Sequence, residues 1–479
     1  MGMDIYPNEA CGYNGGMASH FNNYQSPLSW RYGSEIMRRV WSETNKRLLW
    51  RDVWVALAEV QSQFGLVTRE QVSDLIAFKN EVDISRAIEI EAQVRHDLMA
   101  ELKTFAEQAQ LGGKILHLGA TSADIQDNAD ALRIRAAVDL ILEKLSELLL
   151  VLVSRVEEWA DLRIIAFTHL QPAEPTTLGY RFAVYAQDLM NDYEVLNSLR
   201  KNYKGKGFKG AVGTGASYAD LIGVENLPTF EERLSSRLEL PFFPVTTQIY
   251  PRKQEYQVLC ALASAGASLN KLAFDLRIVQ SPGIGELSEH FSDKQVGSSA
   301  MPFKRNPVNA EKINSLARLL ACLPGVAWDN AANSLLERTL DDSANRRFFL
   351  PESFLVLDEM LLTGLNVVKN LQLDVFNCEK NLLNYGPFAS VERVLLALSK
   401  SGADRQEMHE RLREHSMKAW QDFRQNEVIS LQTRLREDPV IQGYISPAEL
   451  DELMQVGDYV GDAPQRARML AEEIRRLFS

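Results

Sequence analysis

One stretch of the chain constrains its fold more than any other feature. Across residues 130–166, apolar residues recur three and four positions apart, with charged residues between them and no glycine or proline after Asp130. This spacing puts the apolar side chains on one helical face, and the absence of helix breakers predicts one very long helix. Because helices of such length usually pack side by side, we expect a bundle. Comparable helical patterns occur at residues 179–203, 254–280, 309–323 and 346–371.

Shorter helical patterns flank the long ones. Residues 34–111 read as short helices, one of which ends near Gly65, and the last hundred or so residues end in a helical pattern at 463–478. No long alternating pattern predicts a strand, although PFFPVTTQIYP allows a short β element. A chain of 479 residues exceeds one compact core. We therefore expect an all-α protein with an N-terminal helical domain (1–121), a central long-helix domain (122–372) and a C-terminal helical domain (373–479).

Composition and charge narrow the function classes. The chain is 46% hydrophobic and 24% charged, as in ordinary soluble proteins, and its net charge of −12 gives no basic footprint for nucleic acid. Any anionic ligand therefore needs a local basic pocket. The four cysteines lack CxxC spacing and the seven histidines form no HExxH pattern, so we expect no disulfide framework, no metal and no cofactor. The cysteines are Cys11, Cys260, Cys322 and Cys378.

The hydropathy pattern predicts a cytoplasmic protein that has no membrane partner. The N-terminal residues lack the apolar core of a signal peptide. The longest apolar stretch, at residues 148–153, is far shorter than the roughly 20 residues that a membrane-spanning helix needs.

Function is expected in four segments between the helices, because loops on a rigid scaffold carry most binding and catalytic groups. The segments are 116–128, 167–177, 204–217 and 281–307. The third, KGKGFKGAVGTGAS, lacks the GxxxxGK[ST] phosphate loop and the GxGxxG dinucleotide pattern, so we interpret it as a close-packed loop near the active site. The fourth contains GSSAMPFKRNP at residues 297–307, which joins a glycine hinge, two hydroxyls, a cation and an amide. A loop of this length in a compact protein is usually functional.

Residues 297–307 resemble the signature GSSxMPxKxNP of the fumarase/aspartase superfamily, and all eight specified positions match. Members of that superfamily share a domain of long bundled helices and fumarate-forming or closely related reactions. The resemblance implies a fumarase/aspartase-like fold, in agreement with the helical patterns.

Other segments resemble the adenylosuccinate lyase family, especially its long animal-like type. They are RHD at 95–97, HLGATS at 117–122, FTHLQPA at 167–173 and ERTLDDSANRR at 337–347. The resemblance runs from about residue 26 to the C-terminus. It implies a carbon–nitrogen lyase of purine biosynthesis that releases fumarate from adenylosuccinate to give AMP. It also implies release of fumarate from the succinylaminoimidazole carboxamide ribotide.

Comparison with that family makes His169 the expected general acid and Ser298 the expected general base. The elimination removes a proton from the succinyl carbon and supplies one to the departing nitrogen, and an imidazole can donate a proton near neutral pH. Serine needs a stabilised alkoxide, for which backbone N–H groups of residues 297–300 and the Lys304 ammonium are available. Chemistry alone does not choose between Ser298 and Ser299, and the family's pattern points to Ser298.

The implied substrate carries phosphate and carboxylate groups, which arginine can bind through two parallel hydrogen bonds. Four arginines lie in matched segments: Arg31, Arg95, Arg338 and Arg347. The family comparison adds further residues expected to bind substrate: Tyr32, His96, Asp97, Thr121, Ser122, Gln248, Lys304, Asn306 and Ser343. Animal members of the family have an arginine where this chain has Lys312. Lysine keeps the positive charge but lacks the planar guanidinium that forms two parallel hydrogen bonds, and we leave Lys312 outside the expected site.

The resemblance also implies a homotetramer whose active sites combine segments from three subunits and act on a small-molecule substrate. Two alternatives stay open. Another lyase of the superfamily, such as argininosuccinate lyase or fumarase, needs no phosphate pocket. A non-catalytic crystallin-like structural protein is expected to lack part of the catalytic set, whereas His169, Ser298 and Lys304 are all present.

Overall fold

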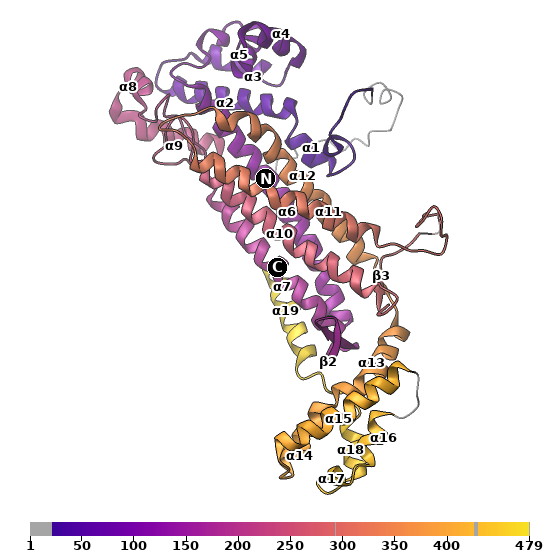
Figure 1. The fold of residues 1–479 in the computed structure, drawn as a ribbon. Helices are drawn as coiled ribbons and strands as arrows, with labels where there is room; N and C mark the ends of the chain where they lie inside the picture. The colour runs from indigo at the N-terminus through magenta and orange to yellow at the C-terminus, as the bar shows by residue number, and fades with distance from the viewer. Residues whose placement is uncertain (1–21, 293, 426–429, 479) are drawn as a thin grey trace.

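A bundle of long helices forms the centre of the molecule in this computed structural model, which describes residues 22–292, 294–425 and 430–478. Short helices lie at both ends of the elongated bundle (Figure 1). The predicted all-α fold with a central bundle is thus confirmed. The long helices are α6 (Ser122–Glu158), α7 (Leu178–Asn202), α10 (Lys253–Val279), α11 (Val308–Ala332) and α12 (Asp341–Lys369).

The N-terminal helices share one continuous core with the bundle, so side chains such as Trp54 and Phe105 pack into the same apolar cluster as Ile141. Polar residues cap these helices, as where Ser34 and Ser42 accept hydrogen bonds at the starts of α1 and α2. The helices are α1 (Glu35–Val40), α2 (Glu43–Gln63), α3 (Arg69–Phe78), α4 (Ile84–Val94) and α5 (Asp97–Gln108), with short 3-10 helices η2 (Pro27–Ser29) and η3 (Gly112–Ile115). A second small group lies between α7 and α10: α8 (Ala216–Ile222), η4 (Val224–Asn226) and α9 (Leu227–Leu238).

The C-terminal helices have a separate small core around Met408, Leu412 and Leu435. The last helix, α19, leaves this group and packs against α6 and α7 of the bundle. The domain boundaries at residues 121 and 372 remain predictions. The C-terminal helices are α13 (Val375–Ala389), α14 (Val391–Lys400), α15 (Arg405–Arg424), α16 (Leu431–Arg436), α17 (Pro439–Gln442), α18 (Pro447–Leu453) and α19 (Ala463–Leu477).

The long helix predicted for residues 130–166 is displaced in the structure. Helix α6 begins eight residues earlier, where the Asp124 carboxylate accepts a hydrogen bond from the Thr121 amide, and it ends at Glu158. Gly179 explains the close packing at this end, because a Cβ there would lie 2.5 Å from the Val156 carbonyl oxygen. Helix α11 continues past the predicted residue 323, through Pro324.

A β-hairpin follows α6 where a helix end and a loop were expected. Strands β1 (Arg163–Thr168) and β2 (Gln171–Thr177) pair antiparallel, with Thr168 opposite Gln171. Pairing supplies the hydrogen bonds that a helix would otherwise provide, and it buries the β-branched Ile164 and Ile165. A minimal second pair joins β3 (Leu287–Ser288) to β4 (Gln372–Leu373). In PFFPVTTQIYP the described β structure is one bridge, between Gly205 and Phe242.

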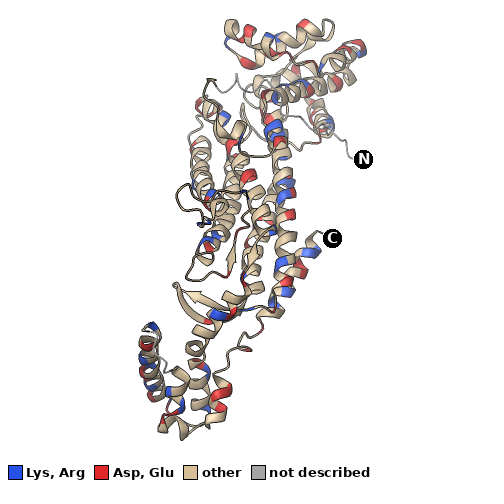
Figure 2. Cartoon of the chain, turned by 90° about the vertical axis from the view of Figure 1, so that its right-hand side faces the viewer, with Lys and Arg blue, Asp and Glu red and all other residues tan. Residues whose placement is uncertain are grey.

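Charged residues of both signs occur along the molecule (Figure 2). Within the described ranges, no helix has the length and apolar character needed to cross a membrane. Cys260, Cys322 and Cys378 carry free thiols, whereas Cys11 lies outside the described residues.

Candidate active site

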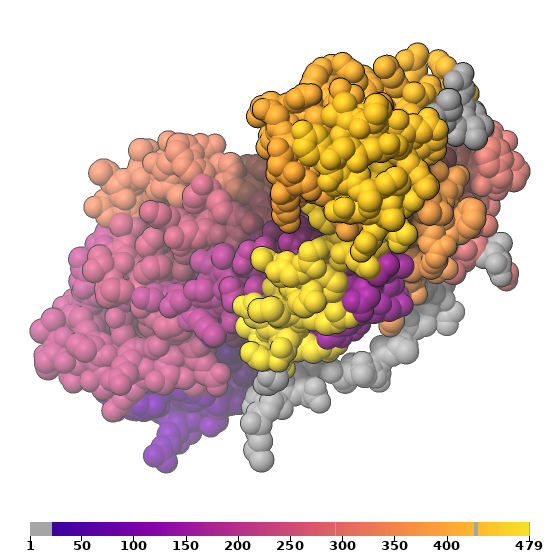
Figure 3. Space-filling model, turned by 90° about the horizontal axis from the view of Figure 1, so that it is seen from below, coloured from indigo at the N-terminus to yellow at the C-terminus, as the bar shows by residue number. Residues whose placement is uncertain are grey.

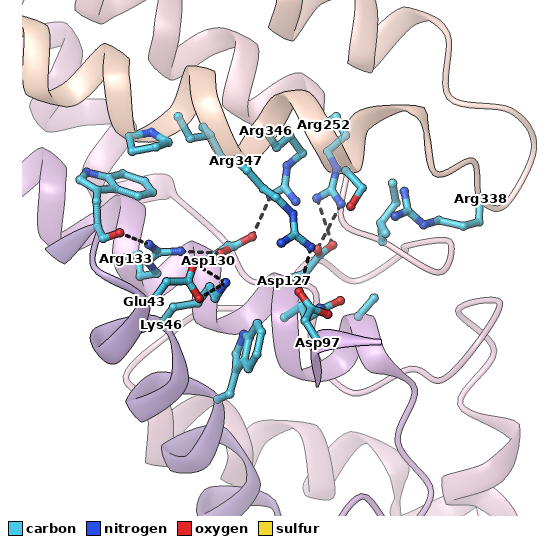
Figure 4. Close-up of a pocket in the computed structure, with 18 residues that line it drawn as sticks. Glu43, Lys46, Asp97, Asp127, Asp130, Arg133, Arg252, Arg338, Arg346 and Arg347 are labelled. Carbon is cyan, nitrogen blue, oxygen red and sulfur yellow. Dashed lines mark hydrogen bonds and ion pairs between the residues drawn. The ribbon is translucent and has the colours of Figure 1, made fainter. Parts of the chain in front are cut away.

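A strongly charged pocket lies between α2, α6 and α12 (Figure 4). Four of the predicted site residues line it, namely Asp97, Arg338, Ser343 and Arg347. The cations of the lining outnumber its carboxylates, so this acidic chain concentrates positive charge here. The charged lining consists of Lys46, Arg133, Arg252, Arg338, Arg346 and Arg347 together with Glu43, Asp97, Asp127 and Asp130.

Arg347 and Asp97 face each other across this pocket. Arg347 Nη2 donates to Asp97 Oδ2 at 2.8 Å, and the Leu98 amide donates to Asp97 Oδ1 at 2.7 Å. Burial alone would raise the pKa of the Asp97 carboxyl, but the Arg347 charge and the Leu98 amide outweigh it and hold the pKa below its usual value. Asp97 is therefore a carboxylate at neutral pH, and it orients a guanidinium whose side chain is 56% exposed.

Two arginines that the sequence reasoning missed form the floor of the pocket. Arg252 donates to Asp342 at 2.7 Å and to Asp127 at 3.1 Å. Arg346 forms ion pairs with Glu255 at 2.6 Å and Asp130 at 3.0 Å. Both guanidinium groups are thus neutralised by carboxylates from other helices.

Arg338 joins this floor at its edge. Its Nη1 donates to Asp342 Oδ1 at 2.7 Å, while a quarter of its side chain stays exposed. Arg338 and Arg347 are therefore the better-placed arginines of the pocket for contact with a ligand.

The 95–97 and 117–126 segments meet beside the pocket. His96 Nδ1 accepts from the Met99 amide at 3.4 Å, and its Nε2 lies 3.4 Å from Ser122 Oγ. Gln126 donates to Asp97 at 3.3 Å. Arg95 is exposed and has a left-handed φ of 55°, which ends α4 and turns the chain into α5.

Asp124 ties this region to the glycine-rich segment 204–217. Its carboxylate accepts from the backbone amides of Thr121 at 3.0 Å, Lys209 at 3.2 Å and Gly210 at 3.2 Å. It also forms an ion pair with Lys206, and both side chains are fully buried. Residues 205–210 of the glycine-rich segment are thus closely packed, as the sequence predicted, whereas most of residues 211–217 are exposed.

His117 is a further polar residue near His96 that lay in a matched segment but was not selected. Trp54 Nε1 donates to its Nδ1 at 3.1 Å, which fixes the proton on Nε2. Burial chiefly lowers the pKa of His117, and His96 adds to this against the opposing effect of Asp124. The ring is therefore neutral at physiological pH.

The signature loop leaves the side of the bundle between β3 and α11 (Figure 1). Ser298 Oγ accepts hydrogen bonds from the Met301 amide at 3.1 Å and the Ala300 amide at 3.3 Å. The Asn306 side-chain amide donates to the Gly297 carbonyl at 2.9 Å and closes the loop. Lys304 is exposed. The two adjacent serines thus differ, because Ser298 Oγ accepts from two backbone amides and is partly buried, whereas Ser299 is exposed.

His169 lies at the tip of the β1–β2 hairpin. His169 and Leu170 have φ values of 53° and 57°, the left-handed pair that a two-residue type I′ turn requires. The tip is exposed, and the hairpin packs against α13, where the rings of Phe167 and Tyr385 contact each other at a centroid distance of 6.2 Å. Seen from below, the hairpin reaches the surface beside α19 (Figure 3).

Within one chain, these parts are not brought together. Helix α6 has 37 residues and, at about 1.5 Å per residue, is roughly 55 Å long. Its first turns line the pocket, whereas the hairpin with His169 follows its far end. Arg31 and Tyr32 precede α1, and the Gln248 amide donates to the Glu337 carbonyl at 3.2 Å beside the pocket.

Comparison with protein families gives two matches. Residues 33–320 match the family described as lyase, and residues 387–469 match the family described as adenylosuccinate lyase C-terminus.

Curated relatives cover most of the chain. An adenylosuccinate lyase of Schistosoma mansoni is 39% identical and covers 83% of this chain and 84% of its own length. The Saccharomyces cerevisiae adenylosuccinate lyase is 36% identical with 95% of both chains covered. The Pyrococcus horikoshii adenylosuccinate lyase is 35% identical over 94% of this chain and 98% of its own.

Solved structures share the fold. A 3-carboxy-cis,cis-muconate lactonizing enzyme from Pseudomonas putida superimposes with a TM-score of 0.83 at 23% identity, covering 95% of this chain and all of its own. A fumarate lyase from Mesorhizobium sp. BNC1 gives 0.82 at 24% identity, with 92% and 98% covered.

Proposed function

Because the chain belongs to the adenylosuccinate lyase family, whose members release fumarate from adenylosuccinate to leave AMP, we propose how its own residues carry this reaction. His169 is the general acid that protonates the departing purine nitrogen. Ser298 is the general base that removes the proton from the succinyl carbon. No metal or cofactor takes part in the proposed steps.

The hydrogen bonds at Ser298 Oγ are the observation that carries the proposal. Two backbone N–H groups donate to this oxygen and would stabilise it as an alkoxide. The same bonds support Ser298 over the exposed Ser299. In the complex, the Lys304 ammonium stabilises the negative charge that develops on the succinyl carboxylate after the proton leaves.

The pocket supports binding of a substrate that carries phosphate and carboxylate groups. Arg338 and Arg347 contact these groups, with Asp97 orienting Arg347 and Ser343 donating a hydrogen bond. The remaining binding residues that we propose are Arg31, Tyr32, Arg95, His96, Thr121, Ser122, Gln248 and Asn306. The succinylaminoimidazole carboxamide ribotide carries the same groups, and we propose it as a second substrate in purine biosynthesis.

A homotetramer with shared active sites would bring the separated parts together. The length of α6 keeps His169 away from the pocket of its own chain, which supports the proposal that another copy supplies the missing group. Exposed apolar side chains on the bundle suit contact between copies. Examples are Val195, Phe274, Leu319, Trp328 and Phe348. We propose the cytoplasm as the location.

The chemistry is tested by an absorbance assay with adenylosuccinate. Wild-type protein should turn over, whereas His169→Ala and Ser298→Ala should each lower kcat by about 100-fold or more. Ser299→Ala is the matched control and should keep most activity. Full activity of Ser298→Ala with loss in Ser299→Ala would reverse the assignment of the base. Turnover of argininosuccinate or malate, without turnover of adenylosuccinate, would contradict adenylosuccinate as the substrate.

Shared sites are tested by mixing two inactive variants. Subunits of His169→Ala and Ser298→Ala that are dissociated and reassembled together should regain activity, because some mixed sites contain neither substitution. Light scattering checks the assembly. A fully active monomer would contradict the tetramer.

A further inference from the structure

Two neighbouring carboxylates on α12 hold the turn that carries Arg31 and Tyr32. Glu359 Oε2 accepts a hydrogen bond from the Gly33 amide at 2.9 Å. Asp358 Oδ2 accepts one from the next amide, that of Ser34. The amides of Gly33 and Ser34 are thus bound to side chains more than 320 positions away.

The same turn is fixed from two other directions. Arg38 Nη1 donates to the carbonyl oxygens of Tyr32, at 3.0 Å, and Gly33. Gly33 has a φ of 77°, and a Cβ there would lie 2.9 Å from Leu355 Cδ2 of α12. The turn therefore packs directly against α12, and its backbone position depends on the side chains of that helix.

Adjacent carboxylates on one helix repel each other unless cations neutralise them. Lys144 of α6 pairs with Asp358 at 2.8 Å, and Lys312 of α11 pairs with Glu359 at 2.7 Å. Thr363 also donates to Glu359 at 3.2 Å. Glu359 is therefore held between the Lys312 ammonium and the Gly33 amide, with one carboxylate oxygen bound to each.

We propose that Lys312 is a positioning residue that acts on the substrate through Glu359 and the 31–34 turn. It fixes the Glu359 carboxylate, which fixes the Gly33 amide and so the direction in which Arg31 and Tyr32 leave the turn. An ammonium suffices for this task, because Glu359 needs one cation rather than a planar guanidinium. The inference rests on the proposed role of Arg31 and Tyr32 in binding substrate.

The test measures kcat and KM for adenylosuccinate in the full-length assembled enzyme. Lys312→Met should raise KM about tenfold and leave kcat within about twofold, because a binding group is displaced while the reacting groups are untouched. Lys312→Arg keeps the charge and should restore KM to within about twofold of wild type. Lys271→Met is the matched control, because Lys271 pairs with Asp275 on α10, away from the turn. Its KM should not change.

Double variants separate a relay from a direct contact. If Lys312 acts through Glu359, Lys312→Met should add nothing to the rise in KM already caused by Glu359→Gln, and nothing in an Arg31→Ala background. Independent, multiplying effects would overturn the relay and indicate direct contact with substrate. An unchanged KM in Lys312→Met, together with a raised KM in Arg31→Ala, would overturn this inference alone. An unchanged KM in Arg31→Ala would instead overturn the proposed binding role of Arg31, and the inference with it.

Discussion

Arg347 donates to Asp97 over 2.8 Å and joins two segments that lie 250 positions apart in the chain. Asp97 starts α5 and Arg347 lies in the second turn of α12. Only 12% of the Asp97 side chain is exposed, against 56% for Arg347. The carboxylate is therefore the fixed partner and the guanidinium the accessible one.

Replacing Asp97 should disturb substrate binding more than the chemical step. In Asp97→Asn the Arg347 guanidinium loses the charge that orients it, so we expect KM for adenylosuccinate to rise about fivefold or more, with a smaller change in kcat. Steady-state kinetics measure both. Asp139→Asn breaks an exposed pair with Arg200 on the outer side of the bundle and should leave KM unchanged. Equal effects in the two variants would contradict a role for Asp97 in the pocket.

The Asp124–Lys206 pair should be important for stability. Asp124→Asn leaves the Lys206 ammonium buried beside a neutral side chain, which costs about 3–5 kcal/mol and should lower the unfolding midpoint in urea. Replacing Lys206 by Met in the same chain removes the unpaired charge and should recover part of the loss. If the double variant is less stable than Asp124→Asn, the burial of the lone ammonium is not the cause.

The signature loop needs glycine at position 297 for a steric reason. A Cβ at Gly297 would lie 2.1 Å from the Lys304 carbonyl oxygen, so Gly297→Ala forces the loop open. We expect kcat to fall by about tenfold or more, with little change in the thermal unfolding midpoint because the loop is on the surface. Gly283→Ala is the control, since its Cβ would meet nothing within 4 Å. A normal kcat in Gly297→Ala would show that the loop tolerates opening.

Asp438 should make the C-terminal helices sensitive to acid. Burial raises the pKa of its carboxyl, but hydrogen bonds from His415, Arg411 and the backbone amides of Val440 and Ile441 lower it to about 2. Because the folded-state pKa is depressed, the stabilisation is fully present above the usual carboxyl pKa of about 4 and is lost as the pH falls towards 2.

The stabilisation from Asp438 amounts to about 2 kcal/mol at neutral pH, so Asp438→Asn should increase hydrogen exchange in α15 to α18 at pH 6. The difference from wild type should be smaller at pH 3. A difference that grows in acid would contradict the depressed pKa.

Much of the fold was predictable because helix periodicity is local. The bundle could be predicted from apolar spacing, but the end of α6 could not, since the apolar run continues through Ile164 and Ile165. Those residues form a strand because β2 pairs with them, and a partner strand with two prolines gives little signal of its own. The His169 turn depends on the same pairing.

The candidate site was only partly predictable for a related reason. Motif resemblance selected Asp97, Arg338, Ser343 and Arg347, and these do meet in one pocket. Arg252 and Arg346 were missed, because in sequence they look like ordinary charges of helix surfaces. Only the packing of α6, α10 and α12 turns them into a buried floor with Asp127 and Glu255.

The closure of the signature loop by its own hydrogen bonds has an entropic consequence. Asn306 bonds to Gly297, Ser298 bonds to two amides of the loop, and the Lys304 amide donates to the Met301 carbonyl at 3.0 Å. Ordering an open segment costs about 1–2 kcal/mol of conformational entropy per residue, and here this loss occurs when the protein folds rather than when substrate arrives. The free energy of contacts between the loop and the substrate can therefore favour the reaction, because none of it is needed to offset the entropy lost when the loop becomes ordered.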